Sequence, residues 1–431
     1  MKQIGKWLIV IPIVIGIAVA IGIAFRNQMA IISEQNKIEK VFGNIATKTA
    51  EISKLYTYGT SLNVEGKIKD ISKDNFEGIK LLLTDGEAYE KYYSVSYTFE
   101  GNDLVFTTAE TMNWGIGLDE IPIGTYYLQA RIKVNNAKDF KYYTLSNSGN
   151  NPNIEYYTLT KEKTNRKIEI QFRTEKWKEK TYRYLGLVVT NAKLPENVYD
   201  IVIDSGHGGT DAGEISNGNT ESALMLEYGK ALKTALEAKG YKVKLTRDDG
   251  NNDSFTSTNM YDEEGRINIA CRTKAKYMIS LHTGESGYSG IQVYVPNNVD
   301  FTLASQIANA LYNSSSLEFS PNKAYKKQEG IYQKNYTEDE IKGRKANLEK
   351  QGIEPYSLTT NTPNLYTIRE VGGIATNAYV DGRNPNYGKN QYYQSNQGIE
   401  CYQISLGSLK NNADILLSEK EQIVNAIANC F

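Results

Sequence analysis

Histidine and cysteine, two of the common metal-binding residues, are scarce in this sequence. The chain of 431 residues has two histidines, His207 and His282, and three cysteines. The cysteines show no CxxC spacing, which argues against a disulfide framework and a cysteine-bound zinc site. Neither sign of charge prevails, since 49 basic and 50 acidic residues leave a formal net charge of -1. We therefore expect no nucleic-acid partner.

Charged residues are also missing from one stretch near the amino terminus. Residues 7–25 contain no charge, with Lys2 and Lys6 before them and Arg26 after them. Such a run is long enough to span a bilayer and longer than the apolar core of a signal peptide. Basic residues on its amino-terminal side favour a cytoplasmic amino terminus. The pattern predicts an uncleaved, single-pass transmembrane anchor at 1–26, with the bulk of the chain outside the cytoplasm.

Two regions of different periodicity come after the apolar run. Between 27 and 58, apolar residues recur largely at spacings of three, four and seven. This pattern predicts a helical stalk that either packs on the next domain or pairs with another copy. Between 59 and 194, short alternating runs separated by glycine, asparagine and aspartate predict an all-β, sandwich-like domain. Its tyrosines either stack on sugar rings or are ordinary strand residues.

The second half of the chain, 198–431, alternates between strand and helix patterns. The pattern predicts strands at 198–204, 241–247, 277–282, 290–295 and 399–406. It predicts helices at 221–239, 262–275 and 302–313. Alternation of this kind predicts an α/β domain whose mostly parallel sheet is flanked by helices. An aperiodic stretch at about 318–398 predicts a structured insertion near the cleft, for substrate binding, partner docking or surface elaboration.

Both histidines stand at the ends of apolar runs in this domain. His207 lies in a glycine-rich turn after the run 198–204, and His282 ends the run 277–282. Glu221 opens the helical pattern after the turn. Ligands of α/β domains collect at the carboxyl ends of the strands. Two neutral imidazoles and a carboxylate, with one position left open, suit a catalytic zinc ion, so these three residues are the candidate ligands.

The order and spacing of several motifs resemble those of the zinc-dependent N-acetylmuramoyl-L-alanine amidases of the amidase-3 type. Besides the Glu221 helix, the motifs are DSGHGGTDAGE at 204–214, VKLTRDD at 243–249, RINIACRTKAKYMISLHTG at 266–284 and GIQVYV at 290–295. The resemblance covers roughly 198–431. It implies that His207, Glu221 and His282 bind Zn²⁺, and that the substrate is peptidoglycan, cut between muramic acid and L-alanine. Combined with the predicted anchor, it implies a cell-membrane protein that faces the cell wall.

One position departs from this family pattern. Members of the family carry a catalytic glutamate in the last strand, two residues before a glycine, and Ser405 stands at that position here. A serine cannot carry the proton between water and the departing amine, and losing a general acid–base costs about 10²–10⁴-fold in rate. Glu400 lies five residues away, so a regular strand points it to the opposite face. Glu370 and Glu285 are further candidates that the sequence does not place.

Two functions of different classes are compatible with these residues. The first is a zinc amidase, impaired by Ser405 unless another acid takes over the role of the glutamate. The second is a zinc-bearing pseudoenzyme that binds peptidoglycan or a cell-wall partner without cutting it.

Overall fold

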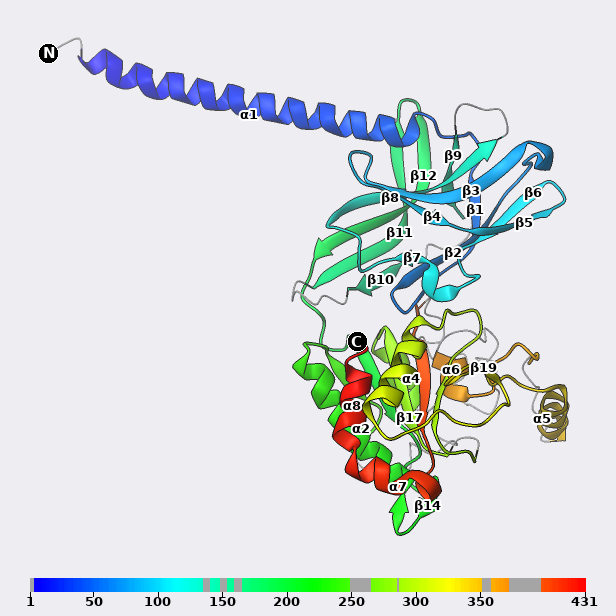
Figure 1. Ribbon diagram of the computed structural model, residues 1–431. Helices are drawn as coiled ribbons and strands as arrows, with labels where there is room; N and C mark the ends of the chain where they lie inside the picture. The colour runs from blue at the N-terminus through cyan, green and yellow to red at the C-terminus, as the bar shows by residue number, and fades with distance from the viewer. Residues whose placement is uncertain are drawn as a thin grey trace.

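The computed structural model shows a long amino-terminal helix, a β-rich region and an α/β region, in that order along the chain (Figure 1). The structure describes residues 4–134, 140–147, 153–158, 165–248, 265–284, 287–350, 358–371 and 397–431.

Helix α1 runs without a break from Ile4 to Phe42. Its carboxyl end packs on the β-rich region, where Val41 and Phe42 are buried and the ring of Phe42 contacts three tyrosine rings. The stalk predicted at 27–58 is therefore helical only as far as Phe42, because Ala50–Tyr58 form strand β1.

The predicted transmembrane anchor at 7–25 is corrected by the structure. No helix is both long enough and apolar enough to cross a membrane, as far as the described residues extend. The uncharged run is part of a longer helix that continues through Glu34, Lys37 and Lys40 before it meets the β-rich region. The predictions of a transmembrane segment, a membrane partner and a cell-membrane localisation, which all needed a membrane-spanning helix, do not stand.

The β-rich region forms one continuous sheet, which corrects the prediction of a sandwich-like domain in that its two halves are joined by hydrogen bonds. Strand β9 pairs with β8 on one side and with β1 on the other, which joins the two halves. The strands are β1 (Ala50–Tyr58), β2 (Ser61–Ile68), β3 (Phe76–Thr84), β4 (Glu90–Ser94), β5 (Ser96–Glu100), β6 (Asp103–Thr107), β7 (Ile116–Gly117), β8 (Gly124–Val134), β9 (Lys141–Ser146), β10 (Ile154–Tyr157), β11 (Arg166–Trp177) and β12 (Lys180–Asn191).

The alternation read from the sequence explains how this sheet is covered. On β11, Ile168, Ile170 and Phe172 are buried, whereas the residues between them are partly exposed. Such alternation is typical of strands with one face on a core. The buried faces of the two halves share one apolar core, in which Leu62 and Val64 of β2 join Leu81 of β3.

The α/β region is built on a seven-stranded sheet in the order β16-β13-β17-β22-β18-β20-β19. Its elements, with those that surround it, are β13 (Ile201–Ser205), β14 (Ile215–Ser216), β15 (Asn219–Thr220), α2 (Glu221–Ala238), β16 (Val243–Leu245), α3 (Arg266–Arg272), β17 (Tyr277–His282), β18 (Ile291–Tyr294), α4 (Thr302–Ser314), β19 (Lys326–Gln328), β20 (Ile331–Tyr332), α5 (Glu338–Lys350), α6 (Tyr366–Val371), β21 (Gln397–Gly398), β22 (Glu400–Leu406), α7 (Leu409–Ser418) and α8 (Lys420–Ala428).

This sheet is mixed, and the prediction of a mostly parallel one fails at two pairings, β18 with β22 and β19 with β20. Strands β16, β13, β17 and β22 are parallel, but β18 runs antiparallel to β22. A parallel return needs a crossover of about a dozen residues or more, usually a helix. The described part of the 283–290 connection holds no helix, so the chain re-enters the sheet in the opposite direction.

The central strand β22 is buried along its whole length. Tyr402, Ile404 and Leu406 face the core that holds apolar residues of α2, α4 and α8, and Cys401 faces the core beside α3 and α6. Each fully buried side chain of this size contributes about 1.5–3 kcal/mol through the hydrophobic effect. Position 405 therefore lies on an interior strand of the sheet, whose neighbours fix its place.

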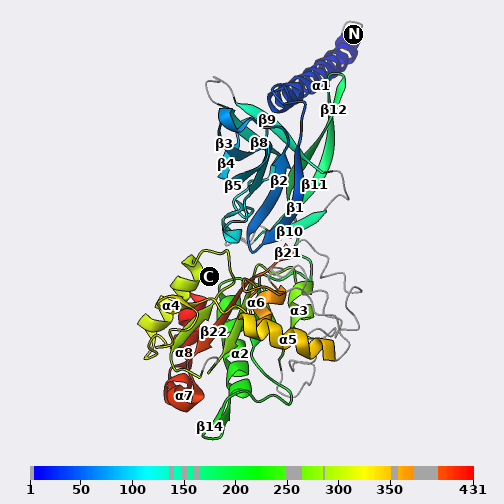
Figure 2. The same cartoon turned by 90° about the vertical axis from the view of Figure 1, so that its right-hand side faces the viewer.

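The β-rich region packs on the amino-terminal ends of the parallel strands. Strand β21, which directly precedes β22, pairs with β1, and the Asn113 amide donates to Glu400 Oε1 at 3.2 Å. The carboxyl ends of the strands point the other way, toward α7 and the β14 hairpin (Figures 1 and 2). Residues placed at those ends are thus on the side of the sheet away from the β-rich region.

Candidate metal centre

The turn after β13 delivers His207 to the carboxyl end of the sheet. His207 has a φ of 59°, a left-handed conformation that few non-glycine residues adopt. Its neighbour Gly206 must be a glycine, because a Cβ there would lie 2.5 Å from His282 Cε1 and 2.7 Å from the Leu281 carbonyl oxygen. The close approach of this backbone to β17 brings the two histidine rings to a centroid distance of 5.3 Å.

Glu221 is the first residue of α2 and is held by two backbone amides. The Glu214 amide donates to Glu221 Oε2 at 3.0 Å, and the Thr283 amide donates to Oε1 at 2.7 Å. Only 2% of the side chain is exposed. Burial raises the pKa of this carboxyl, but hydrogen bonds and charge from His207 and His282 outweigh it and lower the pKa overall. Glu221 is therefore a fixed carboxylate.

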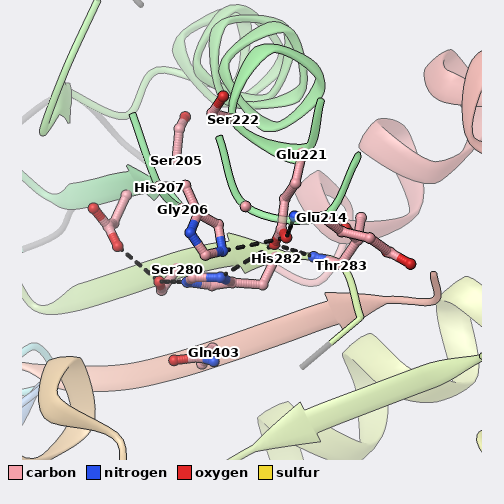
Figure 3. Close-up of polar contacts among 12 residues, drawn as sticks. Ser205, Gly206, His207, Glu214, Glu221, Ser222, Ser280, His282, Thr283 and Gln403 are labelled. Atoms are coloured by element: carbon pink, nitrogen blue, oxygen red, sulfur yellow. Dashed lines mark hydrogen bonds and ion pairs between the residues drawn. The ribbon is translucent and has the colours of Figure 1, made fainter. Parts of the chain in front are cut away.

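The Glu221 carboxylate faces both histidines from one side, as Figure 3 shows. Its Oε2 is 3.2 Å from His207 Nε2, and its Oε1 is 3.4 Å from His282 Nδ1. The donor atoms of the three residues all lie within 4.8 Å of one another. The structure thus brings together the three residues that the sequence singled out, from three separate elements.

The spacing of these atoms suits a zinc ion. Tetrahedral ligands at about 2.0–2.1 Å from zinc lie about 3.3–3.4 Å from each other, close to the separations of 3.2 and 3.4 Å at Glu221. Burial lowers the pKa of His207, but Glu221 and Asp211 together raise it to about 9. A metal ion that binds here must displace the proton of His207.

Each histidine has a further partner on the nitrogen that faces away from Glu221. His207 Nδ1 lies 2.9 Å from Asp211 Oδ2, and His282 Nε2 lies 3.2 Å from Ser280 Oγ. Sequence reasoning missed both Asp211 and Ser280, although Asp211 is part of the turn motif. Ser280 stands two residues before His282, the spacing that puts two strand residues on one face.

Ser405 lies beside His282 on the neighbouring strand. His282 pairs with Ser405 between β17 and β22, and Ser405 pairs with Gln292 between β22 and β18. Paired residues project to the same face of a sheet, so the three side chains form a row across it. Ser405 is fully buried, and its Oγ has no hydrogen-bond partner.

Two of the acids considered as replacements for the family glutamate have buried partners of their own, and the third is outside the described residues. Glu400 is buried at the junction with the β-rich region, where Tyr402 and Asn113 donate to it. Glu370 is buried beside Arg369, whose Nε donates to its Oε1 at 2.8 Å. Glu285 is not among the residues that the structure describes.

A further acid near the centre, at the end of the motif 204–214, was not predicted to be a site residue. Glu214 precedes Glu221 in the same segment, and its Oε2 lies 3.4 Å from Thr283 Oγ1. Its carboxylate accepts from Ser408 Oγ and from the Leu409 amide, both at 2.6 Å, at the start of α7. These bonds direct the carboxylate to the helix terminus, where negative charge is stabilising.

Known proteins resemble the α/β region. The profile of the N-acetylmuramoyl-L-alanine amidase family matches residues 201–430. A sporulation-specific N-acetylmuramoyl-L-alanine amidase of Bacillus subtilis is 26% identical over 229 residues, 51% of this chain and 80% of that protein. The amidase LytC of the same species is 33% identical over 102 residues, 24% of this chain and 19% of that protein. The solved structure of amidase AmiC2 of Nostoc punctiforme aligns with a TM-score of 0.33 at 19% identity, over 54% of this chain and 94% of that one.

Proposed function

This chain belongs to the N-acetylmuramoyl-L-alanine amidase family, and we propose that it is a zinc-dependent member that binds peptidoglycan and cuts it slowly. The bond concerned is the amide between muramic acid and L-alanine. The observation that carries the proposal is the set of donor atoms on His207, Glu221 and His282, which lie within 4.8 Å of one another. When bound, Zn²⁺ supplies Lewis-acid activation of the amide and of water.

The chain's own residues bind the metal and position its ligands. His207, Glu221 and His282 hold the metal, and the amides of Glu214 and Thr283 hold the Glu221 carboxylate in place. Hydrolysis also needs a group that takes a proton from water and gives one to the departing amine. In the row His282, Ser405 and Gln292, no side chain is a carboxylate.

Described carboxylates around the centre are already engaged. Asp204 pairs with Arg266, Asp211 with His207, and Glu214 with the start of α7. Burial alone would raise the pKa of Asp204 and of Asp211, but Arg266 and His207, respectively, lower it, so both carboxylates are weak proton acceptors. This supports a slow reaction in the unmodified chain.

The alternative is a pseudoenzyme that binds zinc and peptidoglycan, or a cell-wall partner, without cutting. The buried, unpartnered hydroxyl of Ser405 favours it. A serine hydroxyl has no pKa suited to proton transfer at neutral pH. Only a measurement of turnover distinguishes a protein that binds without hydrolysis from one that hydrolyses slowly.

The test compares the unmodified chain with Ser405→Glu and Ser405→Gln on purified peptidoglycan. The glutamine has the size of glutamate without its charge, and so controls for altered packing. We expect Ser405→Glu to release peptide from glycan about 10²-fold faster or more, and Ser405→Gln to bring no gain. Undetectable turnover in the unmodified chain, with binding retained, supports the pseudoenzyme. Rapid release by the unmodified chain, with no gain in Ser405→Glu, overturns the account of Ser405.

A further inference from the structure

A chain of buried polar groups leads from His282 into the sheet. Ser280 precedes His282 on β17 and faces the same side, and its Oγ lies 3.2 Å from His282 Nε2. The same oxygen lies 2.7 Å from Oδ2 of Asp204, on the adjacent strand β13. Asp204 and Ser280 are both 0% exposed, so these contacts are made without competition from solvent. Figure 3 shows Ser280 next to His282 on the side away from Glu221.

The direction of each hydrogen bond is set by the donors available. Asp204 forms an ion pair with the buried Arg266, whose Nη1 lies 2.9 Å from Oδ1. The carboxylate can only accept, and its Oδ1 also accepts from Thr246 Oγ1 at 2.8 Å.

Oδ2 then accepts a hydrogen bond from the Ser280 hydroxyl, which has only one proton to donate. With that proton committed, the Ser280 oxygen can only accept from His282. The His282 nitrogen that faces it, Nε2, must therefore carry a hydrogen.

We propose that Asp204 and Ser280 form a relay that fixes the tautomer of His282, with Nε2 protonated and Nδ1 left free for the metal. Both are positioning residues, because they act through His282. Nδ1 is the nitrogen that lies 3.4 Å from Glu221 Oε1. The opposite tautomer would set the lone pair of Nε2 against an oxygen without a proton, and would put a hydrogen where the metal belongs.

The two histidines thereby present different ring nitrogens to the metal, and different partners fix their tautomers. Asp211 accepts directly from His207 Nδ1, which leaves Nε2 toward Glu221. His282 is set through a serine, with the carboxylate one step further away. Partners of this kind orient metal-binding histidines and tune their basicity.

The first experiment determines the tautomer of His282 in the unmodified chain. With two histidines in the sequence, long-range ¹H–¹⁵N correlation of histidine-labelled protein gives two ring systems, and His207→Ala assigns them. We expect a hydrogen on Nε2 of His282 both with and without zinc. A hydrogen on Nδ1 of His282 with none on Nε2 in the metal-free protein overturns the relay, and no variant of the relay is needed to see it.

The second experiment compares Ser280→Ala with Thr246→Val. Each removes one hydroxyl that donates to Asp204, but only Ser280 contacts His282. We expect Ser280→Ala to weaken zinc binding, measured by chelator competition, about 10–100-fold, Thr246→Val to change it less than about threefold, and Ser280→Thr to restore it. Equal losses in Ser280→Ala and Thr246→Val would mean that the hydroxyls only support the fold.

The relay rests on the proposed zinc site, yet the experiments can contradict either proposal without the other. If the unmodified chain binds no zinc, the proposed function fails, whereas the metal-free tautomer still tests the relay. If zinc binds normally but Ser280→Ala binds it equally well, only the relay is wrong.

Discussion

Ser405 lies directly opposite His282 in the parallel pairing of β22 with β17. Side chains at paired positions stand on the same face of a sheet, with Cβ atoms about 5 Å apart. A change at position 405 is therefore made next to the candidate metal centre, although 0% of Ser405 is exposed.

The hydroxyl of Ser405 should contribute nothing to stability. It is buried without a hydrogen-bond partner, and an unpaired buried hydroxyl costs about 1–3 kcal/mol. We expect Ser405→Ala to leave the free energy of unfolding unchanged or to raise it by about 1 kcal/mol, measured by denaturant titration. Ser280→Ala is the matched control and should lower it, since Ser280 donates to Asp204. Equal destabilisation by the two substitutions would show that Ser405 has a partner.

Zinc content tests the three candidate ligands directly. Elemental analysis of the purified protein should give about one zinc ion per chain, and His207→Ala should reduce it sharply because one donor of three is lost. Cys430→Ser should keep the zinc, since Cys430 donates to the Ala426 carbonyl in α8, apart from the three candidate ligands. Unchanged zinc in His207→Ala contradicts the assignment.

Zinc affinity should rise with pH up to about 9. Glu221 and Asp211 raise the pKa of His207 to about 9, so a proton competes with the metal below that pH. The expected slope is about tenfold in affinity per pH unit between about pH 7 and 9.

The stability of the metal-free protein should instead fall as the pH rises. The stability that protonated His207 provides is present below its unfolded pKa of about 6.5 and is lost as the pH rises through about 9. Chelator competition and metal-free unfolding, each measured across this range, check the two signs. A zinc affinity that does not change with pH would show that His207 binds no proton in competition with the metal.

Glu400 should make the fold less stable as the pH rises through neutrality. Burial raises its pKa to about 7, against hydrogen bonds from Tyr402 and Asn113 that lower it. The folded state therefore keeps a proton that the unfolded state releases near pH 4.5, and stability falls between about pH 4.5 and 7, by an amount on the order of 3 kcal/mol.

Glu400→Gln should remove this pH dependence, because glutamine resembles the protonated acid. The measurement is the thermal unfolding midpoint of both proteins from about pH 5 to 8. Glu338→Gln, on the exposed surface of α5, should behave like the unmodified chain. A midpoint of the unmodified chain that is constant over this range would mean that Glu400 is ionised throughout.

The sequence was sufficient where the pattern is local. An apolar run that ends in glycine and histidine specifies a buried strand and the turn after it, so the positions of His207, Glu221 and His282 were predicted from spacing and motif. The alternation of strand and helix patterns likewise predicted strands near 201–205, 277–282 and 400–406. The uncharged run near the amino terminus was a local pattern as well, yet no described helix is both long enough and apolar enough to cross a membrane.

Only the tertiary structure decided how those elements meet. The direction of β18, the joining of two half-sheets by β9, and the place of Ser405 beside His282 depend on pairing between residues far apart in the chain. The same holds for the relay, since Asp204 and Ser280 touch only because β13 and β17 are neighbours in register. Strand order and register are fixed by the packing of the whole domain, and a sequence pattern of period two specifies a face but not the neighbour across from it.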